Sequence, residues 1–237
     1  MSVWTSTTRL RAKDVNLHRR LRTSRLLEML QEASIEHTEE LGWGRDKTLD
    51  RGFLWVVVMQ RLEIARMPEY DEVVRVSSWP GEAMHVLFPR HYALKDASGE
   101  VLVRGSAFWT IVDTNTRQMA RPEDHGVVIG GVVTGDEIEL PRLIRSEDCR
   151  RADSLTVPFS YCDLNGHMNN TRYLDVAEDR LAGAAEGWEL AGLSIEYARE
   201  LRFGDALEVR WREDAKSAYV EGRHGDARCF CVRIDYR

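Results

Sequence analysis

The segment from residue 161 to 173 concentrates side chains that could do chemistry. It carries a carboxylate, an amide and an imidazole at alternate positions, Asp163, Asn165 and His167. An imidazole titrates near neutral pH, and a neighbouring carboxylate can fix its orientation. This combination of residue types therefore suits hydrolysis near pH 7.

The same segment also has the features of a plain strand-to-helix turn. The Asn-Gly pair in its middle favours a turn, and Asn169 or Asn170 can cap the helix that follows. A capped turn needs no ionisable pair, so it gives no reason for Asp163 and His167. These two residues remain candidates for catalysis.

Two helices and a series of strands must position this segment. Apolar residues recur at helical spacing over residues 24–41 and again from about 170 to 186, and Gly42 and Gly187 end the two runs. The other apolar runs have β-type composition, and their connections are too short for parallel crossovers, so we expect antiparallel strands. The predicted strands are 53–64, 72–79, 86–94 and 101–112 in the first half, and 155–162, 193–201, 206–212, 218–222 and 228–236 in the second.

The order of helix, strand, acidic turn and further strands occurs twice. Residues 66–71 and 200–205 occupy matching places, which indicates an internal duplication. An antiparallel sheet must cover its apolar face, and each half offers one long helix for this. We therefore expect an α+β protein that resembles a double hotdog, with two sheets that each wrap around a central helix. The expected parts are a first repeat at 1–135, a linker at 136–152 and a second repeat at 153–237.

Composition limits the class of protein further. With 43% apolar residues, the 237-residue chain is globular, and its 33 basic and 39 acidic residues give a net charge of −6. No overall positive field draws it to nucleic acid or to a membrane. The four cysteines do not form a disulfide pattern and no histidine pair has metal-ligand spacing, so we expect no metal and no cofactor. No apolar run reaches the length of a signal peptide core or a membrane span, so we expect a cytoplasmic protein.

The spacing of Asp163, Asn165, His167, the two asparagines after it and Tyr173 resembles the active-site signature of acyl-acyl carrier protein (acyl-ACP) thioesterases of the plant and bacterial type. Members of that family have a double hotdog fold. Residues 195–200 resemble a second block of the family. Further similar segments lie in the first half, at 30–33, 55–57, 68–79, 109–113 and 116–117.

The resemblance implies a thioesterase of lipid metabolism, a hydrolase that releases fatty acid from acyl-ACP and so ends fatty acid synthesis. It implies catalytic roles for Asp163, Asn165 and His167, and a role for Glu200 in activating water. Where the family has a cysteine after this glutamate, the chain has Leu201, which favours direct attack by water over a thiol nucleophile. Either Glu200 or His167 can be the base, with the other as the orienting group.

The position of the substrate follows from the same reasoning. We expect the thioester carbonyl at the start of the second helix, near Asn169 and Asn170, where unpaired amides would stabilise an oxyanion. The first half has no Asp-x-Asn-x-His sequence before its helix, so we expect it to hold the acyl chain. Flexible thioethers suit an alkyl chain, and Met29, Met59 and Met67 are candidates to line its tunnel.

A basic segment suggests where a carrier protein would dock. Residues 9–25 contain seven basic residues and a single acid. An acyl carrier protein is acidic and bears the acyl chain on a phosphopantetheine arm, so charge complementarity favours docking at Arg19, Arg20 and Arg22. A solvated surface explains the same charges. A homodimer is a separate expectation.

Three other functions stay open at this point. An acyl-CoA thioesterase would share the site and differ at its entrance. A hydroxyacyl dehydratase also places a histidine and an acid at a thioester on a hotdog fold, but it forms a double bond and releases no thiol. A lipid-binding module on the same scaffold would bind acyl chains without any turnover.

Overall fold

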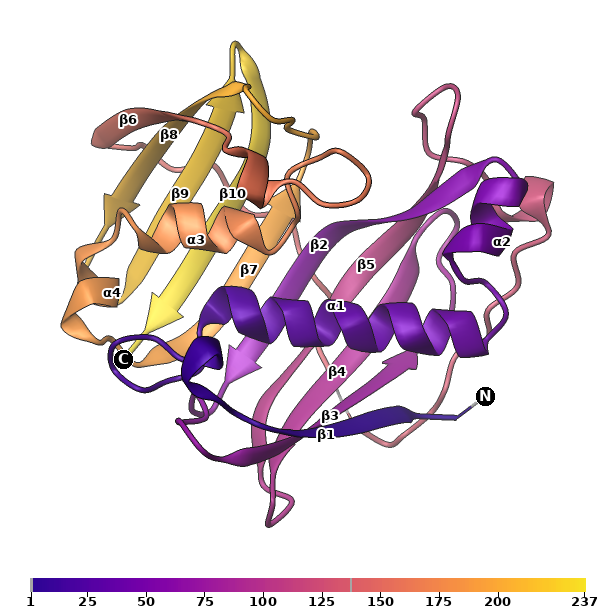
Figure 1. Ribbon diagram of the computed structural model, residues 1–237, viewed down its shortest axis with the longest axis horizontal. Helices are drawn as coiled ribbons and strands as arrows, with labels where there is room; N and C mark the ends of the chain where they lie inside the picture. The colour runs from indigo at the N-terminus through magenta and orange to yellow at the C-terminus, as the bar shows by residue number, and fades with distance from the viewer. Residues whose placement is uncertain (1, 137) are drawn as a thin grey trace.

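The structure is a computed structural model that describes residues 2–136 and 138–237. In this part of the chain ten strands form one antiparallel sheet (Figure 1). The strands of the first half are β1 (Trp4–Arg9), β2 (Phe53–Ile64), β3 (Val73–Pro80), β4 (Phe88–Asp96) and β5 (Val101–Asp113), and those of the second half are β6 (Arg151–Thr156), β7 (Leu190–Tyr197), β8 (Ala206–Glu213), β9 (Ser217–His224) and β10 (Ala227–Tyr236).

The strand order repeats itself in the two halves. It runs β1-β3-β4-β5-β2 and then, in mirrored sequence, β7-β10-β9-β8-β6. Each first strand therefore lies at an outer edge, and each second strand lies at the centre. There β2 pairs with β7, from Met59 opposite Glu196 to Glu63 opposite Gly192, and joins the halves. The predicted antiparallel pairing and the predicted duplication are confirmed.

The long helix of the first half forms where the sequence predicts it. Helix α1 (Thr23–Glu40) crosses one face of the sheet and buries Leu26, Leu30 and Ala33 against it (Figure 1). It ends before Gly42, whose φ of 77° is in the left-handed region that favours glycine. A short helix, α2 (Arg45–Asp50), follows and was not predicted. None of the helices within the described ranges is long and apolar enough to cross a membrane.

The second helical region is broken, whereas the sequence predicts one helix from about 170 to 186. Helix α3 (Arg172–Glu178) and helix α4 (Ala182–Glu186) are separated at Leu181, which is extended and buried. The carboxylate of Glu213 accepts hydrogen bonds from the amides of residues 182 and 183, at 2.9 and 2.7 Å. This contact from β8 starts a new helix and ends the old one.

The strand predicted at 155–162 is wrong in its position. Strand β6 begins at Arg151, inside the predicted linker, and the chain then forms a 3₁₀ turn at Phe159–Tyr161. Pro158 precedes this turn and cannot donate a backbone hydrogen bond to a neighbouring strand. Strand β1 was also missed, because its sequence is polar and exposed along one edge of the sheet.

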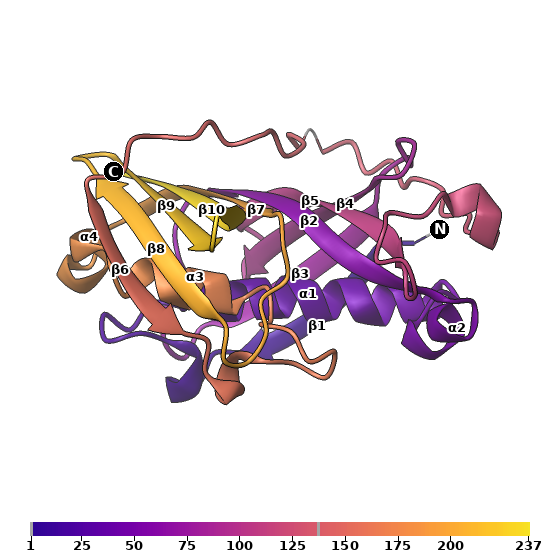
Figure 2. The same ribbon diagram turned by 90° about the horizontal axis from the view of Figure 1, so that it is seen from above.

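The two faces of the sheet are covered differently. Helices α1 and α3 lie on one face, and the connection between β5 and β6 crosses the opposite face (Figure 2). The hydroxyl of Ser106 donates to the carbonyl of Glu139 at 2.6 Å, and the amide of Ile144 donates to the carboxylate of Glu196. Glu196 is buried beneath this connection. We refer to the face under the helices as the inner face and to the other as the outer face.

Candidate active site

One large cavity is lined by residues of both halves of the chain. Its volume is about 1120 Å³, and its walls come from α1, α2, β2, β4 and β5 in the first half and from residues 163–170 and 197–200 in the second. Val57, Phe88 and Trp109 contribute apolar surface. The four predicted catalytic residues all line this cavity: Asp163, Asn165, His167 and Glu200.

The loop that carries three of these residues is held by its own backbone. The amide of Asp163 donates to the carbonyl of His167 at 2.9 Å, and the amide of Gly166 donates to the carbonyl of Asp163 at 2.9 Å. The carboxylate of Asp163 accepts the amide of Asn165 at 2.8 Å, which closes an Asx turn. Gly166 has a φ of 75° and makes the tight reversal without strain. Asp163 therefore shapes the loop.

His167 and Glu200 meet because the loop is tied to the end of β7. The amide of Met168 donates to the carbonyl of Leu201 at 2.7 Å. This bond places the preceding residues, His167 and Glu200, side by side. His167 Nε2 lies 3.1 Å from Glu200 Oε2. The His167 side chain is 17% exposed and that of Glu200 is 41% exposed, so the pair faces the cavity from a partly covered position.

The first repeat supplies a guanidinium to this pair. Arg117 forms an ion pair with Oε1 of Glu200, the carboxylate oxygen that His167 does not contact. Arg117 has a positive φ of 58° in the turn after β5, and its amide donates to the carbonyl of Asp113 at 3.0 Å. Backbone amides of Thr116 and then of Asn115 donate to the Asp113 carboxylate and lower its pKa. The turn is therefore built to hold Arg117 in place.

A second arginine of the first repeat contacts the loop itself. Arg45 Nη2 donates to Asn165 Oδ1 at 2.9 Å. The sequence pattern predicts no role for either arginine. Arg117 lies in a segment, 116–117, that already resembled the family, so a signal for it was present. Arg45 begins α2, a six-residue helix without apolar periodicity, and no pattern in the sequence could have revealed it.

The two asparagines after the loop differ in what they bind. Asn169 Oδ1 accepts the amide of Thr171 at 3.0 Å and its hydroxyl at 2.8 Å, and the Asn169 carbonyl accepts the amide of Arg172 at 3.0 Å. These bonds occupy the amides of Thr171 and Arg172, so neither of them is free for an oxyanion at the start of α3. The expected oxyanion site at this helix end stays a prediction. Asn170 Nδ2 is buried and has no partner among the residues described. It lines the cavity near the Tyr197 hydroxyl, and its amide group has two N–H donors.

Two family models match the chain. The acyl-ACP thioesterase N-terminal domain matches residues 2–127, and the acyl-ACP thioesterase C-terminal domain matches residues 145–229. The chain belongs to the acyl-ACP thioesterase family.

Curated relatives from plants resemble this family member at modest identity. The acyl-[acyl-carrier-protein] hydrolase FATB3 of Cuphea viscosissima is 28% identical over 84% of this chain and 52% of its own length. The dodecanoyl-[acyl-carrier-protein] hydrolase of Cinnamomum camphora is 26% identical over 87% of this chain and 58% of its own length. Both names include the word chloroplastic. The chain spans about half the length of the curated relatives it matches.

Solved structures share the fold of this acyl-ACP thioesterase family member. An acyl-ACP thioesterase from Bacteroides thetaiotaomicron superposes with a TM-score of 0.87 at 22% identity, over 99% of this chain and 98% of the other. The 12:0-ACP thioesterase from Umbellularia californica gives 0.84 at 21% identity, over 99% and 97%. The expected double hotdog fold is confirmed.

The family member does not use the methionines in the expected way. Met29, Met59 and Met67 are not among the described residues that line the cavity. Met29 and Met67 are buried in the main core. Met59 pairs across the sheet with Glu196, whose carboxylate binds the outer connection, so Met59 faces the outer side.

The three arginines predicted to dock a carrier protein lie away from the cavity. Arg19 stacks on the ring of Tyr70 at 5.3 Å, and Arg22 Nε donates to the Val15 carbonyl at 3.0 Å. Arg20 donates to the carbonyls of residues 187 and 188, at 2.9 and 2.8 Å, and so joins the two repeats. In the described part of the chain the cavity is instead lined by other arginines, namely Arg45, Arg90, Arg117 and Arg199.

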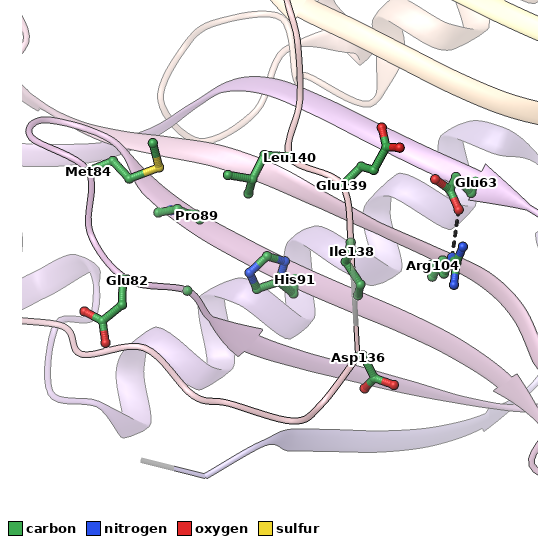
Figure 3. A pocket seen from close by; sticks show the side chains of 11 residues that line it. Glu63, Glu82, Met84, Pro89, His91, Arg104, Asp136, Ile138, Glu139 and Leu140 are labelled. Atoms are coloured by element: carbon green, nitrogen blue, oxygen red, sulfur yellow. Dashed lines mark hydrogen bonds and ion pairs between the residues drawn. The ribbon is translucent and has the colours of Figure 1, made fainter.

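A second cavity lies on the outer face. It has a volume of about 640 Å³ and lies between strands of the first repeat and the connection at residues 138–140 (Figure 3). Its charged walls include Glu63 and Arg104, which form a salt bridge at 2.7 Å. The sheet separates it from the inner face, and none of the predicted site residues lines it among those described. The predicted catalytic residues therefore lie at the inner cavity and not at this one.

Proposed function

We propose that this protein hydrolyses the thioester of fatty acyl-ACP and releases free fatty acid, which terminates fatty acid synthesis. One observation carries the proposal: His167 Nε2 lies 3.1 Å from Glu200 Oε2 inside a cavity with room for an acyl chain. Membership of the acyl-ACP thioesterase family supports the same activity.

Water is the proposed nucleophile. No cysteine occurs among the described residues that line the cavity, and the residue after Glu200 is the buried aliphatic Leu201. A general base must then take a proton from water as the water attacks the thioester carbon. Such a step contributes about 100- to 10,000-fold to the rate.

The contact between the two residues favours one assignment of the base. A carboxylate only accepts hydrogen bonds, so Nε2 of His167 carries the proton in its bond to Glu200. The neutral imidazole then has its lone pair on Nδ1, where it can take a proton from water. Glu200 fixes this tautomer and the orientation of the ring, and Arg117 fixes Glu200. We therefore assign His167 as the base and Glu200 as its orienting residue.

Stabilisation of the oxyanion falls to side-chain amides in this proposal. Asn170 Nδ2 is buried in the cavity wall without a partner among the described residues, and the thioester oxygen is a suitable acceptor for it. A single oxyanion donor of this kind contributes about 3 kcal/mol to transition-state stabilisation. Asn165 is fixed through Oδ1 by Arg45, which leaves its amide nitrogen for the substrate or the water.

The experiment compares wild type with His167→Ala and Glu200→Gln on acyl-ACP. Glu36→Gln is the matched control, because Glu36 is exposed on α1 and does not line the cavity. The proposal expects kcat to fall by about 100- to 10,000-fold in His167→Ala and to stay unchanged in the control. Retained turnover in His167→Ala would contradict it, and acyl binding without turnover in wild type would favour a lipid-binding module.

The acyl carrier is the second question. Four arginines and four carboxylates line the cavity, so its charges balance. Arg45 and Arg199 form no salt bridge among the described residues, and their guanidinium groups suit the phosphate of a pantetheine arm. Acyl-CoA carries the same arm, so it is the alternative substrate. Rates on one acyl chain attached to either carrier decide between them, and faster turnover of acyl-CoA would overturn the preference for ACP. A cytoplasmic location and a homodimer remain predictions.

A further inference from the structure

The first repeat buries a charged side chain inside the cavity that should hold the acyl chain. Arg90 on β4 is 5% exposed and lines the cavity. Its Nε donates to the hydroxyl of Ser78 at 2.9 Å, and its Nη2 donates to the carbonyl of Ser34 at 3.3 Å. A guanidinium has five N–H donors, so three of them are not used by these bonds.

Nothing nearby neutralises Arg90. Within the described part of the chain no carboxylate forms a salt bridge with it, whereas Arg117 on the same cavity is paired with Glu200. Burial lowers the pKa of Arg90 to about 10, which still leaves it charged at neutral pH. Buried charges are normally paired, because removing a charge from water is costly. An unpaired buried arginine therefore indicates a partner that the chain itself does not supply.

The groups around Arg90 already have partners or have none to offer. The hydroxyl of Ser34 binds the Leu30 carbonyl at 2.8 Å and the Tyr92 hydroxyl at 2.7 Å, and the Tyr92 hydroxyl accepts Trp109 Nε1 at 3.2 Å. His37 is fully buried one turn further along α1, and burial, followed by the charge of Arg90, lowers its pKa to about 4. It is neutral at pH 7 and adds no negative charge.

The apolar part of the cavity wall offers a surface for the rest of a ligand. Ile35, Trp55, Val57 and Phe88 line the same cavity and present apolar surface. The catalytic pair comes from the second repeat, whereas Arg90 comes from the first. A chain whose thioester is bound at His167 therefore shares one cavity with these apolar walls and with Arg90.

We infer that the preferred acyl chain carries an oxygen substituent, a hydroxyl, keto or carboxyl group, that accepts hydrogen bonds from Arg90. This inference rests on the proposed function and deepens it, since it names the class of acyl group. A plain alkyl chain would displace cavity water from Arg90 and leave its donors without partners. Sites built to bind a substrate oxygen discriminate strongly against analogues that lack it.

The experiment measures kcat/KM on acyl-ACP thioesters of matched length that end in a methyl, a hydroxyl or a carboxyl group, over a series of lengths. Wild type is compared with Arg90→Met and Arg90→Gln, and with Arg75→Met as the matched control, because Arg75 is an exposed strand residue. Melting temperatures check that each variant is folded.

We expect wild type to prefer an oxygenated chain over the alkyl chain by about 10- to 100-fold at its best length. Arg90→Met should lose this preference and Arg75→Met should keep it. Arg90→Gln should keep part of a preference for the hydroxyl chain and lose one for the carboxyl chain, which separates a neutral oxygen from an anion. An alkyl preference in wild type, or an equal ratio in wild type and Arg90→Met, would overturn the inference.

Failure of the proposed function gives a different result. In that case no thioester is hydrolysed in any arm, and binding of the matched free acids by calorimetry decides the inference instead. Tighter binding of hydroxy or dicarboxylic acids than of plain fatty acids, lost in Arg90→Met, would support it. Equal binding of all acids by both proteins would overturn it.

Discussion

The loops that precede the helices of the two repeats have the same backbone and different chemistry. Val15 pairs with Leu21 as Cys162 pairs with Met168. The amide of Asn16 donates to the carbonyl of residue 20 at 2.8 Å, as the amide of Asp163 donates to the carbonyl of residue 167 at 2.9 Å. Each loop also has a positive φ at the equivalent position, 64° at residue 19 and 75° at residue 166. The duplicated scaffold is intact.

The side chains on this scaffold diverge. The first loop carries Asn16, His18 and Arg20 where the second carries an aspartate, an asparagine and a histidine. The amide of Leu21 donates to the Pro68 carbonyl at 2.8 Å, which is the counterpart of the bond from Met168 to Leu201. This register places Met67 at the position of Glu200. The first repeat therefore has an arginine at the position of His167 and a methionine at the position of Glu200, so the catalytic pair has no counterpart there.

This comparison corrects the predicted match between 66–71 and 200–205 by one residue. The amides of residues 65 and 66 donate to the Leu102 carbonyl, as those of residues 198 and 199 donate to the Cys229 carbonyl. Arg66 is thus equivalent to Arg199. The sequence aligns the two acidic turns by residue type. The backbone hydrogen bonds show which residues of the two repeats are structurally equivalent.

The inner faces of the repeats also differ. The first repeat has an 18-residue helix over a cavity, whereas the second has two short helices over a packed core. In the second repeat the ring of Tyr173 lies 4.8 Å from that of Phe230 and fills the space under α3. This packing and the different side chains of the first loop support the proposed division between a chain-binding repeat and a catalytic repeat.

The largest difference between the loops should appear at residues 167 and 20. We expect His167→Ala to lower kcat by about 100- to 10,000-fold and to leave the melting temperature nearly unchanged. Arg20→Ala should do the reverse, because Arg20 binds two carbonyls of the other repeat and lies outside the cavity. Steady-state kinetics and thermal melting of both variants check this. A comparable loss of kcat in Arg20→Ala would break the comparison.

The contribution of the first repeat to catalysis should be intermediate. Arg117→Met removes the ion pair that holds Glu200, and we expect kcat to fall by about ten- to a hundred-fold as the pair loses its geometry. Arg117→Lys should recover part of the rate, which a purely structural role would not give. Arg75→Met serves as the control. An unchanged kcat in Arg117→Met would show that Glu200 is positioned without it.

Substitutions of Asp163 distinguish its role in the shape of the loop from the role of its charge. Asn16 makes the equivalent turn, with its Oδ1 accepting the amide of His18 at 3.0 Å, so an asparagine can replace Asp163 in the Asx turn. We expect Asp163→Asn to keep the melting temperature of wild type and Asp163→Ala to lose about 1 kcal/mol in the free energy of unfolding. Chemical denaturation measures both. Equal destabilisation in the two variants would contradict the equivalence of the loops.

The smallest effects concern stability against pH, and the two repeats should respond in opposite directions. Burial lowers the pKa of His37 in the first repeat from 6.5 to about 4, so the unfolded chain binds a proton that the folded chain excludes. Stability should fall as pH decreases from 6.5 to 4, by on the order of 3 kcal/mol at most. Burial raises the pKa of Glu178 in the second repeat from 4.5 to about 7, so stability should fall as pH increases from 4.5 to 7.

Unfolding curves of His37→Gln and Glu178→Gln across this range test the opposition. Each variant should remove the slope of its own repeat and leave the other. A wild-type slope that neither substitution changes would contradict the assignment of these two groups.

The sequence predicts the parts of this protein that depend on local pattern. Apolar periodicity located α1, and β-type runs located β2 with the bounds that the structure has. Patterns failed where a tertiary contact decides the outcome, as at Leu181, where Glu213 starts a new helix. The site shows the same division. The loop 163–167 was visible in the sequence, but Arg45 reaches it from a helix without periodicity, and Arg90 is noticed only when its burial is known.

The central claim is that His167 and Glu200 act as one unit on water, and a double-mutant cycle tests it most directly. Values of kcat for His167→Ala, Glu200→Gln and the double variant are measured on the same acyl-ACP. If Glu200 only orients His167, the double variant should be no slower than His167→Ala alone. Losses that multiply in the double variant would contradict the claim.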